Sequence, residues 1–277
     1  MVFGRNLTTF AFNLKVPLNK KRVIQHIVNW LNNYCDSALM NGFAVGISGG
    51  IDSALTSTLC ALTGKQVICL NMPIHQHKAE YERGKEHIAW LKKKFKNASS
   101  HETDLTNVFE TFKKTIPEDI LDPLSLANTR SRIRMITLYA FAGNKKLLVA
   151  GTGNKVEDFG VGFFTKYGDG GVDLSPIADL VKSEVYGLAK ELGVVESILK
   201  AKPTDGLWHE ERTDEDQIGA TYDELEWAMQ HLEKKQVSKN LSERQRSVLH
   251  IYEHFNKGNG HKMLPIPVCV IPGDLKK

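Results

Sequence analysis

The feature that most constrains the fold is an apolar run that passes through a glycine pair directly into a helical pattern. Residues 43–47 (Phe-Ala-Val-Gly-Ile) are followed by residues 48–53 (Ser-Gly-Gly-Ile-Asp-Ser), and residues 54–62 are mostly apolar. This order predicts a buried strand, a tight turn and a helix start. Glycines let backbone N–H groups approach an anion closely, and a helix start carries about half a positive charge. The unit therefore predicts an anion-binding loop at the end of a strand.

The pattern around this unit alternates between strands and helices up to about residue 176. Short apolar runs predict strands, and apolar residues at helical spacing predict helices. In chain order we expect helix 18–40, strand 43–47, helix 51–63, strand 66–72, helix 79–95, strand 101–104, helix 106–115, helix 124–142 and strand 146–150. Only helices are expected afterwards, at 178–192, 195–200, 221–234 and 241–257. This order predicts an α/β fold: a doubly wound, mainly parallel sheet with helices on both faces and a helical C-terminal part.

The chain is expected to form a single domain with short extensions, as its 277 residues allow. The expected parts are an N-terminal arm at 1–17, one domain at 18–265 with a sheet core at 43–175 and a helical part at 176–257, and a C-terminal tail at 266–277. Residues 205–217 are polar and rich in acids. They predict a mobile loop that closes as a lid over bound ligands, with Trp208 as its reporter.

Composition argues against a nucleic-acid or membrane protein. The net charge of +4 is mild and the charges are interspersed, which gives no basis for a nucleic-acid partner. No long apolar stretch precedes Lys20-Lys21-Arg22, and no run approaches the length of a membrane span. The four cysteines show no Cys-x-x-Cys spacing, which favours reduced thiols. We therefore expect a cytoplasmic protein with no membrane partner.

The loop at 48–53 combines anion ligands with a potential metal ligand. Ser48 and Ser53 supply hydroxyl donors, whereas Asp52 fits beside a phosphate only if a divalent cation bridges the two. The loop is neither a Walker A sequence nor a dinucleotide fingerprint. Ser-Gly-Gly-x-Asp-Ser resembles instead the pyrophosphate loop of the ATP pyrophosphatases, which cleave ATP between its α and β phosphates. The alternative is a glycine-rich turn without a ligand.

A second constellation follows the strand at 146–150. Residues 151–158 and 163–173 mix glycines, aromatics and charged residues, which indicates backbone packed around a polar ligand, with a structural loop as the alternative. Together with the first loop they resemble the NAD synthetase family, whose members amidate deamido-NAD (nicotinic acid adenine dinucleotide). The same resemblance is carried by Asn128–Met135, Leu180–Lys182, Lys202–Asp205, Thr213–Asp216, Tyr222–Glu224 and Asn259–Lys262. It implies an adenine nucleotide alpha hydrolase-like fold.

The resemblance implies a C–N ligase that makes NAD from deamido-NAD, ATP and ammonia. The carboxylate would attack the α-phosphorus, pyrophosphate would leave, and ammonia would then release AMP from the NAD-adenylate. Because the synthetase motifs begin within the first fifty residues, no room remains for the amidohydrolase domain of glutamine-dependent members, and the ammonia-dependent form is expected. A homodimer is also implied. An all-helical contact through 18–40 and 123–142 would fit it, although these apolar faces fit the monomer core equally well. The alternatives are another ATP pyrophosphatase that amidates or thiolates a different substrate, and a non-catalytic ATP-binding sensor.

The resemblance also implies roles for single residues. The ATP-binding set is Gly46, Ile47, Ser48, Gly49, Gly50, Ile51, Asp52, Ser53, Thr152, Lys182 and Thr204. The deamido-NAD set is Arg132, Lys166, Asp173, His261 and Lys262. Asp52 and Glu157 would hold Mg²⁺ as the cofactor. No residue would act as nucleophile, and charge would be stabilised by Lys182, Ser48 and Asp173.

Three polar residues keep open roles at this point. Asp173 is expected either to accept a hydrogen bond from a ribose hydroxyl or to place ammonium, and Asp169 competes with it for either role. Arg134 is expected to pair with an acid on its own helix face. Leu70 and Met72 are expected either near the adenine or in the core.

Overall fold

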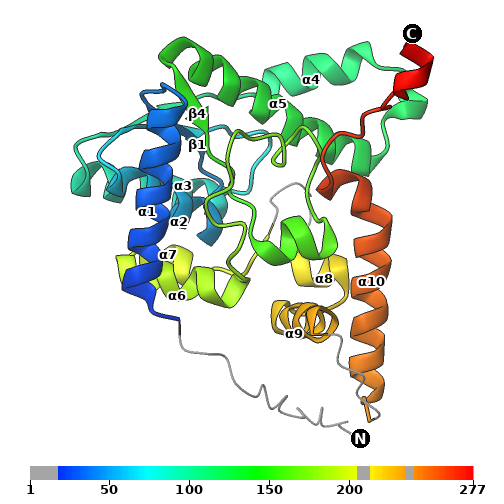
Figure 1. Cartoon of the computed structure of the whole chain (residues 1–277). Helices are drawn as coiled ribbons and strands as arrows, with labels where there is room; N and C mark the ends of the chain where they lie inside the picture. Colours follow the sequence, from blue (N-terminus) through cyan, green and yellow to red (C-terminus); the bar gives the residue numbers. More distant parts are fainter. Residues whose placement is uncertain (1–17, 205–212, 235–239, 277) are drawn as a thin grey trace, which may run out of the picture.

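A four-stranded parallel sheet forms the centre of the molecule (Figure 1). The structure is a computed structural model that describes residues 18–204, 213–234 and 240–276. The strands are β1 (Gly42–Gly46), β2 (Gln66–Asn71), β3 (Ala98–Glu102) and β4 (Leu147–Val149), in the spatial order β3-β2-β1-β4. Phe43 of β1 is in register with Val67 of β2 on one side and Leu148 of β4 on the other. The predicted N-terminal arm, residues 1–17, lies outside the described residues.

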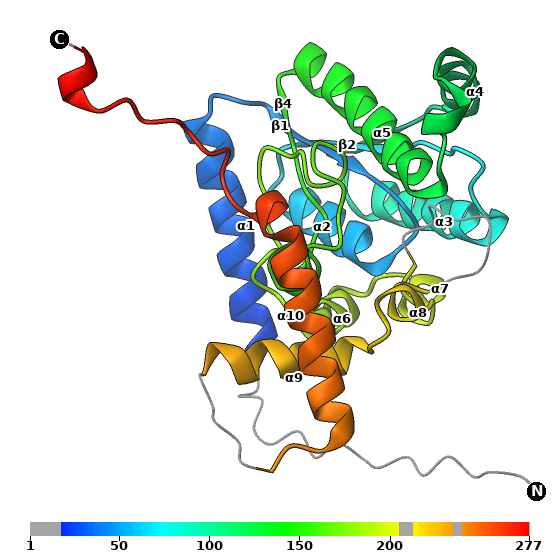
Figure 2. The same ribbon diagram turned by 90° about the vertical axis from the view of Figure 1, so that its right-hand side faces the viewer.

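Helices cover both faces of the sheet, and the helices of the C-terminal part of the chain form a separate layer beside it (Figures 1 and 2). The α-helices are α1 (Lys20–Ser37), α2 (Ile51–Leu62), α3 (Lys78–Lys94), α4 (Thr106–Thr115), α5 (Pro123–Lys145), α6 (Lys182–Leu192), α7 (Glu196–Leu199), α8 (Asp214–Ile218), α9 (Tyr222–Glu233) and α10 (Glu243–Met263). The short helices are η1 (Glu118–Ile120), the π-helix η2 (Val156–Val161) and η3 (Gly273–Lys276).

The two faces of the sheet are packed by different helices because side chains alternate along each strand. Phe43 and Val45 of β1 point into a core shared with α1, α2, α3 and α6. Ala44, between them, points into a second core with α4 and α5. A strand that is buried on both faces has no position left for a polar residue, which explains the continuous apolar runs in the sequence. The predicted fold class is confirmed.

The helical C-terminal part has its own core. Leu225 and Met229 of α9 pack with Val248 and Tyr252 of α10 and with Val161 of η2. Helices α9 and α10 each begin at a capping box, in which a hydroxyl and a side chain three residues later satisfy the free backbone N–H groups. This layer lies beside the sheet domain and brings η2 close to α6 and α9.

Several boundaries differ from the prediction for identifiable reasons. Strand β3 begins at residue 98 rather than 101, because its sequence Ala-Ser-Ser-His-Glu is polar at a sheet edge. Helix α10 continues to Met263 through two glycines that usually end a helix. Of the predicted mobile loop, 205–212 with Trp208 lies outside the described residues, whereas 214–218 forms α8, capped by Thr213.

Other sequence expectations can be compared with the described residues. Three of the cysteines, Cys35, Cys60 and Cys69, are buried free thiols, and Cys269 is an exposed one. Within the described part of the chain, no helix combines the length and the apolarity that a membrane span requires.

His87 predicts how stability depends on pH. The side chain is fully buried between α3 and α2, with Nε2 2.9 Å from Ser57 Oγ, and burial lowers its pKa to about 4. Below pH 6.5 the unfolded chain takes up a proton that the folded chain does not bind. We expect the free energy of unfolding to fall by about 2 kcal/mol between pH 7 and pH 5 from this residue. Urea titrations of the wild type and His87→Gln at both pH values measure it.

The control for this prediction is His26→Gln, at an exposed position of α1. The pH dependence should be smaller in His87→Gln than in the wild type and unchanged in His26→Gln. The same pH dependence in all three proteins would contradict the assignment.

Candidate active site

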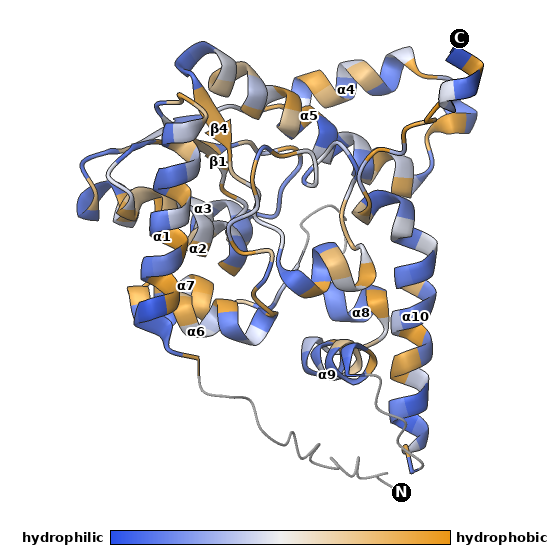
Figure 3. Cartoon of the chain, in the orientation of Figure 1, coloured by the Kyte–Doolittle hydropathy of each residue, from blue (hydrophilic) through white to orange (hydrophobic). Residues whose placement is uncertain are grey.

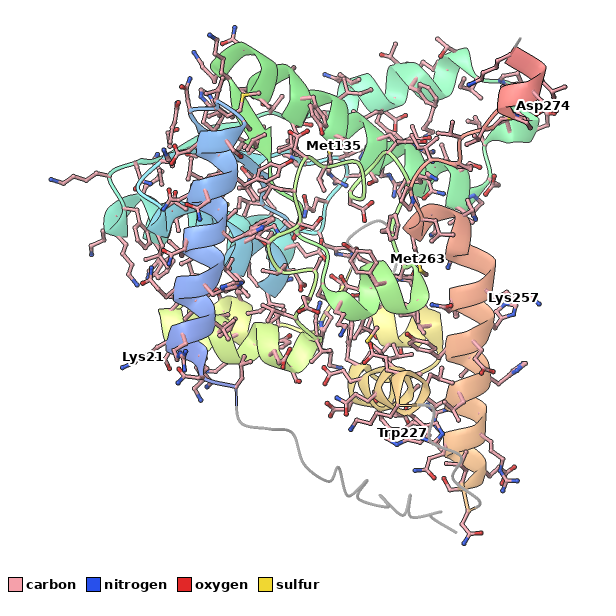
Figure 4. All side chains as sticks on the ribbon, in the orientation of Figure 1. Lys21, Met135, Trp227, Lys257, Met263 and Asp274 are labelled. Atoms are coloured by element: carbon pink, nitrogen blue, oxygen red, sulfur yellow. The ribbon has the colours of Figure 1, made fainter. Side chains whose placement is uncertain are left out.

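A large pocket lies beyond the carboxyl ends of β1, β2 and β4. It is partly open to solvent. Every residue of the predicted ATP-binding set except Gly49 lines it, and so does Glu157. The opposite wall comes from α5 and includes Ser131, Arg134, Met135 and Leu138 (Figure 4 labels Met135). The carboxyl edge of a parallel sheet is the usual ligand site of such folds.

The loop at 48–53 is shaped by hydrogen bonds between its own residues. Gly50 N donates to Ser48 Oγ at 3.2 Å, and the Ser48 and Ser53 hydroxyls lie 3.1 Å apart. Gly50 precedes α2 and offers no side chain to cap it, so the first-turn N–H groups open onto the pocket. Gly49 has a φ of +86°, and a Cβ there would lie 2.3 Å from Glu80 O. Only glycine fits that position.

The ammonium group of Lys182 lies between the two predicted metal ligands. Nζ donates to Asp52 Oδ2 at 2.6 Å and to Glu157 Oε1 at 2.9 Å. The Lys182 side chain is 4% exposed and each carboxylate 16%. Asn154 Nδ2 donates to the other oxygen of Asp52 at 3.1 Å. Three residues that are far apart in the sequence thus form one buried ion cluster.

Burial and charge act in opposite directions on this cluster. Burial alone would lower the pKa of Lys182, but attraction to Asp52 and Glu157 raises it above its usual value, so the lysine stays charged. Burial is the main effect on Asp52 and raises the pKa of its carboxyl despite Lys182. One ammonium therefore faces two carboxylates, so the cluster can accept further positive charge.

Tyr222 of α9 connects this cluster to a third carboxylate. Its hydroxyl donates to Glu157 Oε1 and lies 3.0 Å from Asp214 Oδ2. Its ring lies under the Lys182 ammonium, with Nζ 4.6 Å from the ring centroid. Tyr222 and Asp214 both lie in stretches that carry the family resemblance. The sequence carries no signal for the contact between them, because the contact depends on how α8 and α9 pack against η2.

Glu226 of α9 fixes the start of the helix that begins with Lys182. Its two oxygens accept from Ser183 N at 2.8 Å and Ser183 Oγ at 2.9 Å, and its side chain is 1% exposed. A buried carboxylate at a helix N-terminus is favoured by the helix dipole. Local sequence pattern gives no signal for Glu226, because its partner is 43 residues away.

The π-helix η2, which carries Glu157, is bonded to α10. Asn256 Nδ2 donates to Gly160 O at 2.7 Å, and Asn259 Nδ2 donates to Val161 O at 2.8 Å. These amides satisfy carbonyls at the end of η2 that lack a partner within the helix. The position of η2 is therefore tied to the last turns of α10.

Four of the five predicted deamido-NAD residues gather around the loop at 163–169. Arg132 Nε donates to Lys166 O at 3.3 Å, and Lys166 Nζ donates to His261 O at 2.6 Å. Lys262 Nζ donates to Phe164 O at 2.7 Å. None of the four lines the large pocket. They form a second, basic group of residues beside it, at the end of α10 that Met263 marks in Figure 4.

Asp169 and Asp173 have different surroundings. Asp169 lines the pocket and accepts from Ser131 Oγ at 2.6 Å and from Thr165 N at 3.0 Å, so it holds the loop in shape. Asp173 is exposed and accepts from the Tyr139 hydroxyl at 2.9 Å and from Val149 N at 2.8 Å. The structure therefore does not bring Asp173 to the pocket or into contact with the basic group, and its role remains a prediction.

Arg134 corrects one sequence expectation. Its Nε donates to Met72 O at 3.0 Å, at the end of β2, and its side chain lines the pocket. Helix α5 contains no Asp or Glu, so it offers no acid on the same helix face. Met72 also lines the pocket, whereas Leu70 is fully buried in the core. A contact between residues 62 apart depends on the fold and leaves no trace in helical spacing.

Comparison with known protein families finds a match that spans both groups of residues. Residues 23–265 match NAD synthase. The chain belongs to the NAD synthase family. The matched range contains the pocket loop, the ion cluster and the basic group, and it ends before residues 266–277.

Relatives of this NAD synthase chain cover most of its length. The NH(3)-dependent NAD(+) synthetase of Methanococcoides burtonii is 41% identical over 210 residues, 74% of this chain and 76% of that protein. The solved structure of NMN synthetase from Francisella tularensis has a TM-score of 0.80 and 31% identity, covering 93% of this chain and 100% of that one. The NH3-dependent NAD synthetase from Campylobacter jejuni has a TM-score of 0.75 and 26% identity, covering 92% and 100%.

The ion cluster predicts unequal effects of two substitutions on the stability of this NAD synthase. Asp52→Asn leaves Lys182 paired with Glu157, so we expect the free energy of unfolding to change by less than about 1 kcal/mol. Lys182→Met leaves buried carboxylates without their ammonium and should cost about 3–5 kcal/mol. Urea titrations at pH 7 measure both.

Lys200→Met is the control, because the Lys200 side chain is 78% exposed and its loss should have little effect. Equal losses in Asp52→Asn and Lys182→Met would show that Lys182 does not hold the cluster together.

Proposed function

We propose that the protein is an ammonia-dependent NAD synthetase, which converts deamido-NAD, ATP and ammonia to NAD, AMP and pyrophosphate. The observation that carries this is the buried Lys182 between Asp52 and Glu157, next to the glycine loop, in a chain of the NAD synthase family. A lysine and two acids at a phosphate loop suit cleavage of ATP, whereas a sensor needs only to bind it.

The reaction requires positioning and charge neutralisation but no nucleophile from the protein. A carboxylate oxygen of the nicotinate attacks the α-phosphorus, and the bond to the β-phosphate oxygen breaks. The loop at 48–53 receives the pyrophosphate through backbone N–H groups and the hydroxyls of Ser48 and Ser53. Lys182 neutralises charge that moves to the leaving group. Ammonia then attacks the acyl carbon, AMP leaves, and the ammonia nitrogen gives up a proton.

Mg²⁺ is the proposed cofactor, held by Asp52 and Glu157. Mg²⁺ prefers oxygen ligands such as carboxylates. One oxygen of Asp52 and one of Glu157 both lie within hydrogen-bonding distance of Lys182 Nζ, so the two carboxylates are close together. No cluster of three or more His, Cys, Asp or Glu suited to a metal occurs among the described residues, so phosphate oxygens and water would complete the shell. When bound, Mg²⁺ would neutralise phosphate charge.

The acceptor is proposed to bind at the basic group of Arg132, Lys166, His261 and Lys262. Guanidinium and ammonium groups suit a dinucleotide pyrophosphate and a carboxylate. We further propose a homodimer in the cytoplasm, with no nucleic-acid or membrane partner.

A shorter acceptor is the second candidate. The solved structure with a TM-score of 0.80 is an NMN synthetase, and its identity of 31% exceeds the 26% of the Campylobacter NAD synthetase. The same amidation applied to nicotinate mononucleotide would yield NMN. Values of kcat/KM for deamido-NAD and for nicotinate mononucleotide decide between them.

The decisive experiment incubates the protein with ATP, Mg²⁺, deamido-NAD and ammonium, and follows NAD and pyrophosphate together. We expect equal amounts of both, no NAD without ammonium, and turnover at least 100-fold lower in Asp52→Asn, which should still be folded. Pyrophosphate without NAD would point to another acceptor. ATP binding without either product would favour the sensor.

Lys166→Ala tests the separation of the two substrates. Because Lys166 lies outside the large pocket, its loss should raise KM for deamido-NAD about tenfold, the value of one hydrogen bond to a charged group, and change KM for ATP little. Initial rates with each substrate varied in turn measure this, with Lys200→Ala as the exposed control. Equal increases for both substrates would contradict separate sites.

A further inference from the structure

Glu157, one of the two proposed metal ligands, accepts two hydrogen bonds on the same carboxylate oxygen. Lys182 Nζ donates to Oε1 at 2.9 Å, and the Tyr222 hydroxyl donates to Oε1 as well. An oxygen of an ionised carboxylate offers two lone pairs, so these two donors occupy both of them. A cation bound by Glu157 would therefore be held through Oε2, the oxygen that receives neither donor.

The backbone of Glu157 is already fixed by another residue. Asn154 Oδ1 accepts from Glu157 N at 3.2 Å and from Val156 N at 3.1 Å, at the start of η2. The freedom that remains lies in the rotamers of the Glu157 side chain, and restricting them costs conformational entropy. The Tyr222 hydroxyl acts on this remaining freedom, because it bonds to the end of the side chain.

Tyr222 is held firmly enough to set the position of that carboxylate. It is 5% exposed and lies in the core of the helical C-terminal part, whose mixture of apolar and hydrophilic residues Figure 3 shows. It is the first residue of α9, and its backbone N donates to Glu215 Oε1 at 2.8 Å. Thr221 and Glu224 cap the same turn, and Arg244 Nε donates to Glu224 Oε1 at 2.7 Å. The hydroxyl thus projects from a turn that several contacts fix.

A second carboxylate confines the hydroxyl from another side. Asp214 Oδ2 lies 3.0 Å from the Tyr222 oxygen, and Glu157 Oε1 is the closer of the two acceptors. Asp214 lines the large pocket, and its backbone N donates to Pro203 O at 3.2 Å. A hydroxyl carries one proton and donates it fully to one acceptor at a time. The phenol oxygen is therefore placed between the two acids, with Glu157 as its nearer partner.

The ring and the hydroxyl of Tyr222 contact different members of the ion cluster. The ring faces the Lys182 ammonium, with Nζ 4.6 Å from the ring centroid, whereas the hydroxyl bonds to Glu157. Tyr222→Phe would keep the ring beside the ammonium and fill the same core, but it would remove the bond to the carboxylate. This substitution therefore separates the packing of Tyr222 from its effect on Glu157.

We propose that Tyr222 is a positioning residue for the cleavage of ATP, whose hydroxyl holds Glu157 Oε1 so that Oε2 is presented to the divalent cation. This inference rests on the proposed function, because it adds a residue to the proposed Mg²⁺ site. Tyr222 does not line the large pocket, so it acts through Glu157 and not by contact with the reacting atoms. Removing a partner behind a metal ligand typically lowers metal affinity about 10- to 100-fold.

The test measures binding of Mn²⁺, a paramagnetic substitute for Mg²⁺, without turnover. Electron paramagnetic resonance of free Mn²⁺ gives its dissociation constant in the presence of saturating α,β-methylene-ATP, which is not cleaved between its α and β phosphates. We expect this constant to rise about tenfold in Tyr222→Phe. The affinity for the nucleotide analogue in EDTA should stay unchanged, which shows that the pocket is intact.

The matched control is Tyr252→Phe. Tyr252 is 6% exposed in the same core, and its hydroxyl does not bond to Glu157. The Mn²⁺ dissociation constant of Tyr252→Phe should therefore equal that of the wild type. Far-UV spectra and urea midpoints show that each variant is folded.

A double-mutant cycle distinguishes positioning from packing. In a Glu157→Gln background no carboxylate remains to be positioned, so adding Tyr222→Phe should leave the Mn²⁺ dissociation constant unchanged, whereas a packing effect would appear in both backgrounds. Unchanged Mn²⁺ affinity in Tyr222→Phe, an equal loss in Tyr252→Phe, or the same loss in the Glu157→Gln background would overturn the proposal. A wild type that binds no Mn²⁺ with the analogue would overturn it too.

These measurements use neither deamido-NAD nor ammonia. A protein that forms no NAD but shows the expected loss in Tyr222→Phe would refute the proposed function and leave the role of Tyr222 supported. A protein that forms NAD but shows no loss would do the reverse.

Discussion

The contact on which the site depends is the buried ammonium of Lys182 between Asp52 and Glu157. The three residues come from the starts of α2, η2 and α6, so the cluster fixes three backbone segments relative to one another. A charge in so dry a place is tolerated only when its partners are held firmly. Asn154 and Tyr222 orient the two acids, and Glu226 anchors the helix that presents the lysine.

The arrangement also explains why the neighbouring loop can stay simple. The N–H groups at 48–53 and the hydroxyls of Ser48 and Ser53 would supply directional hydrogen bonds to the proposed pyrophosphate, whereas the ammonium of Lys182, which lines the same pocket, would supply positive charge. Backbone donors need glycine rather than large side chains at close approach, which the contact of Gly49 with Glu80 O illustrates. With backbone donors and a lysine acting together, a short loop would be enough to bind the highly charged pyrophosphate.

The sequence predicts best what depends on local pattern. The buried strands and the loop at 48–53 follow from apolar runs and glycines, because a parallel strand covered on both faces leaves no other choice. Strand β3 is polar and α10 contains two glycines. For this reason the start predicted for β3 and the end predicted for α10 were wrong. Contacts between residues far apart in the sequence could not be predicted from local pattern. The hydrogen bond of Arg134 to Met72 O and the capping of α6 by Glu226 both depend on how the elements pack. The family resemblance grouped the basic residues correctly with one another, but Asp173 lies apart from them.

The π-helix η2 has a consequence for the order of events. Its first turn carries Glu157, which lines the large pocket, and its last carbonyls accept hydrogen bonds from Asn256 and Asn259 of α10. The same helix α10 ends with His261 and Lys262, beside the proposed acceptor site. If Glu157 moves when nucleotide binds, this connection would carry the movement to the proposed acceptor site. Binding of nucleotide and binding of the acceptor would then be thermodynamically linked.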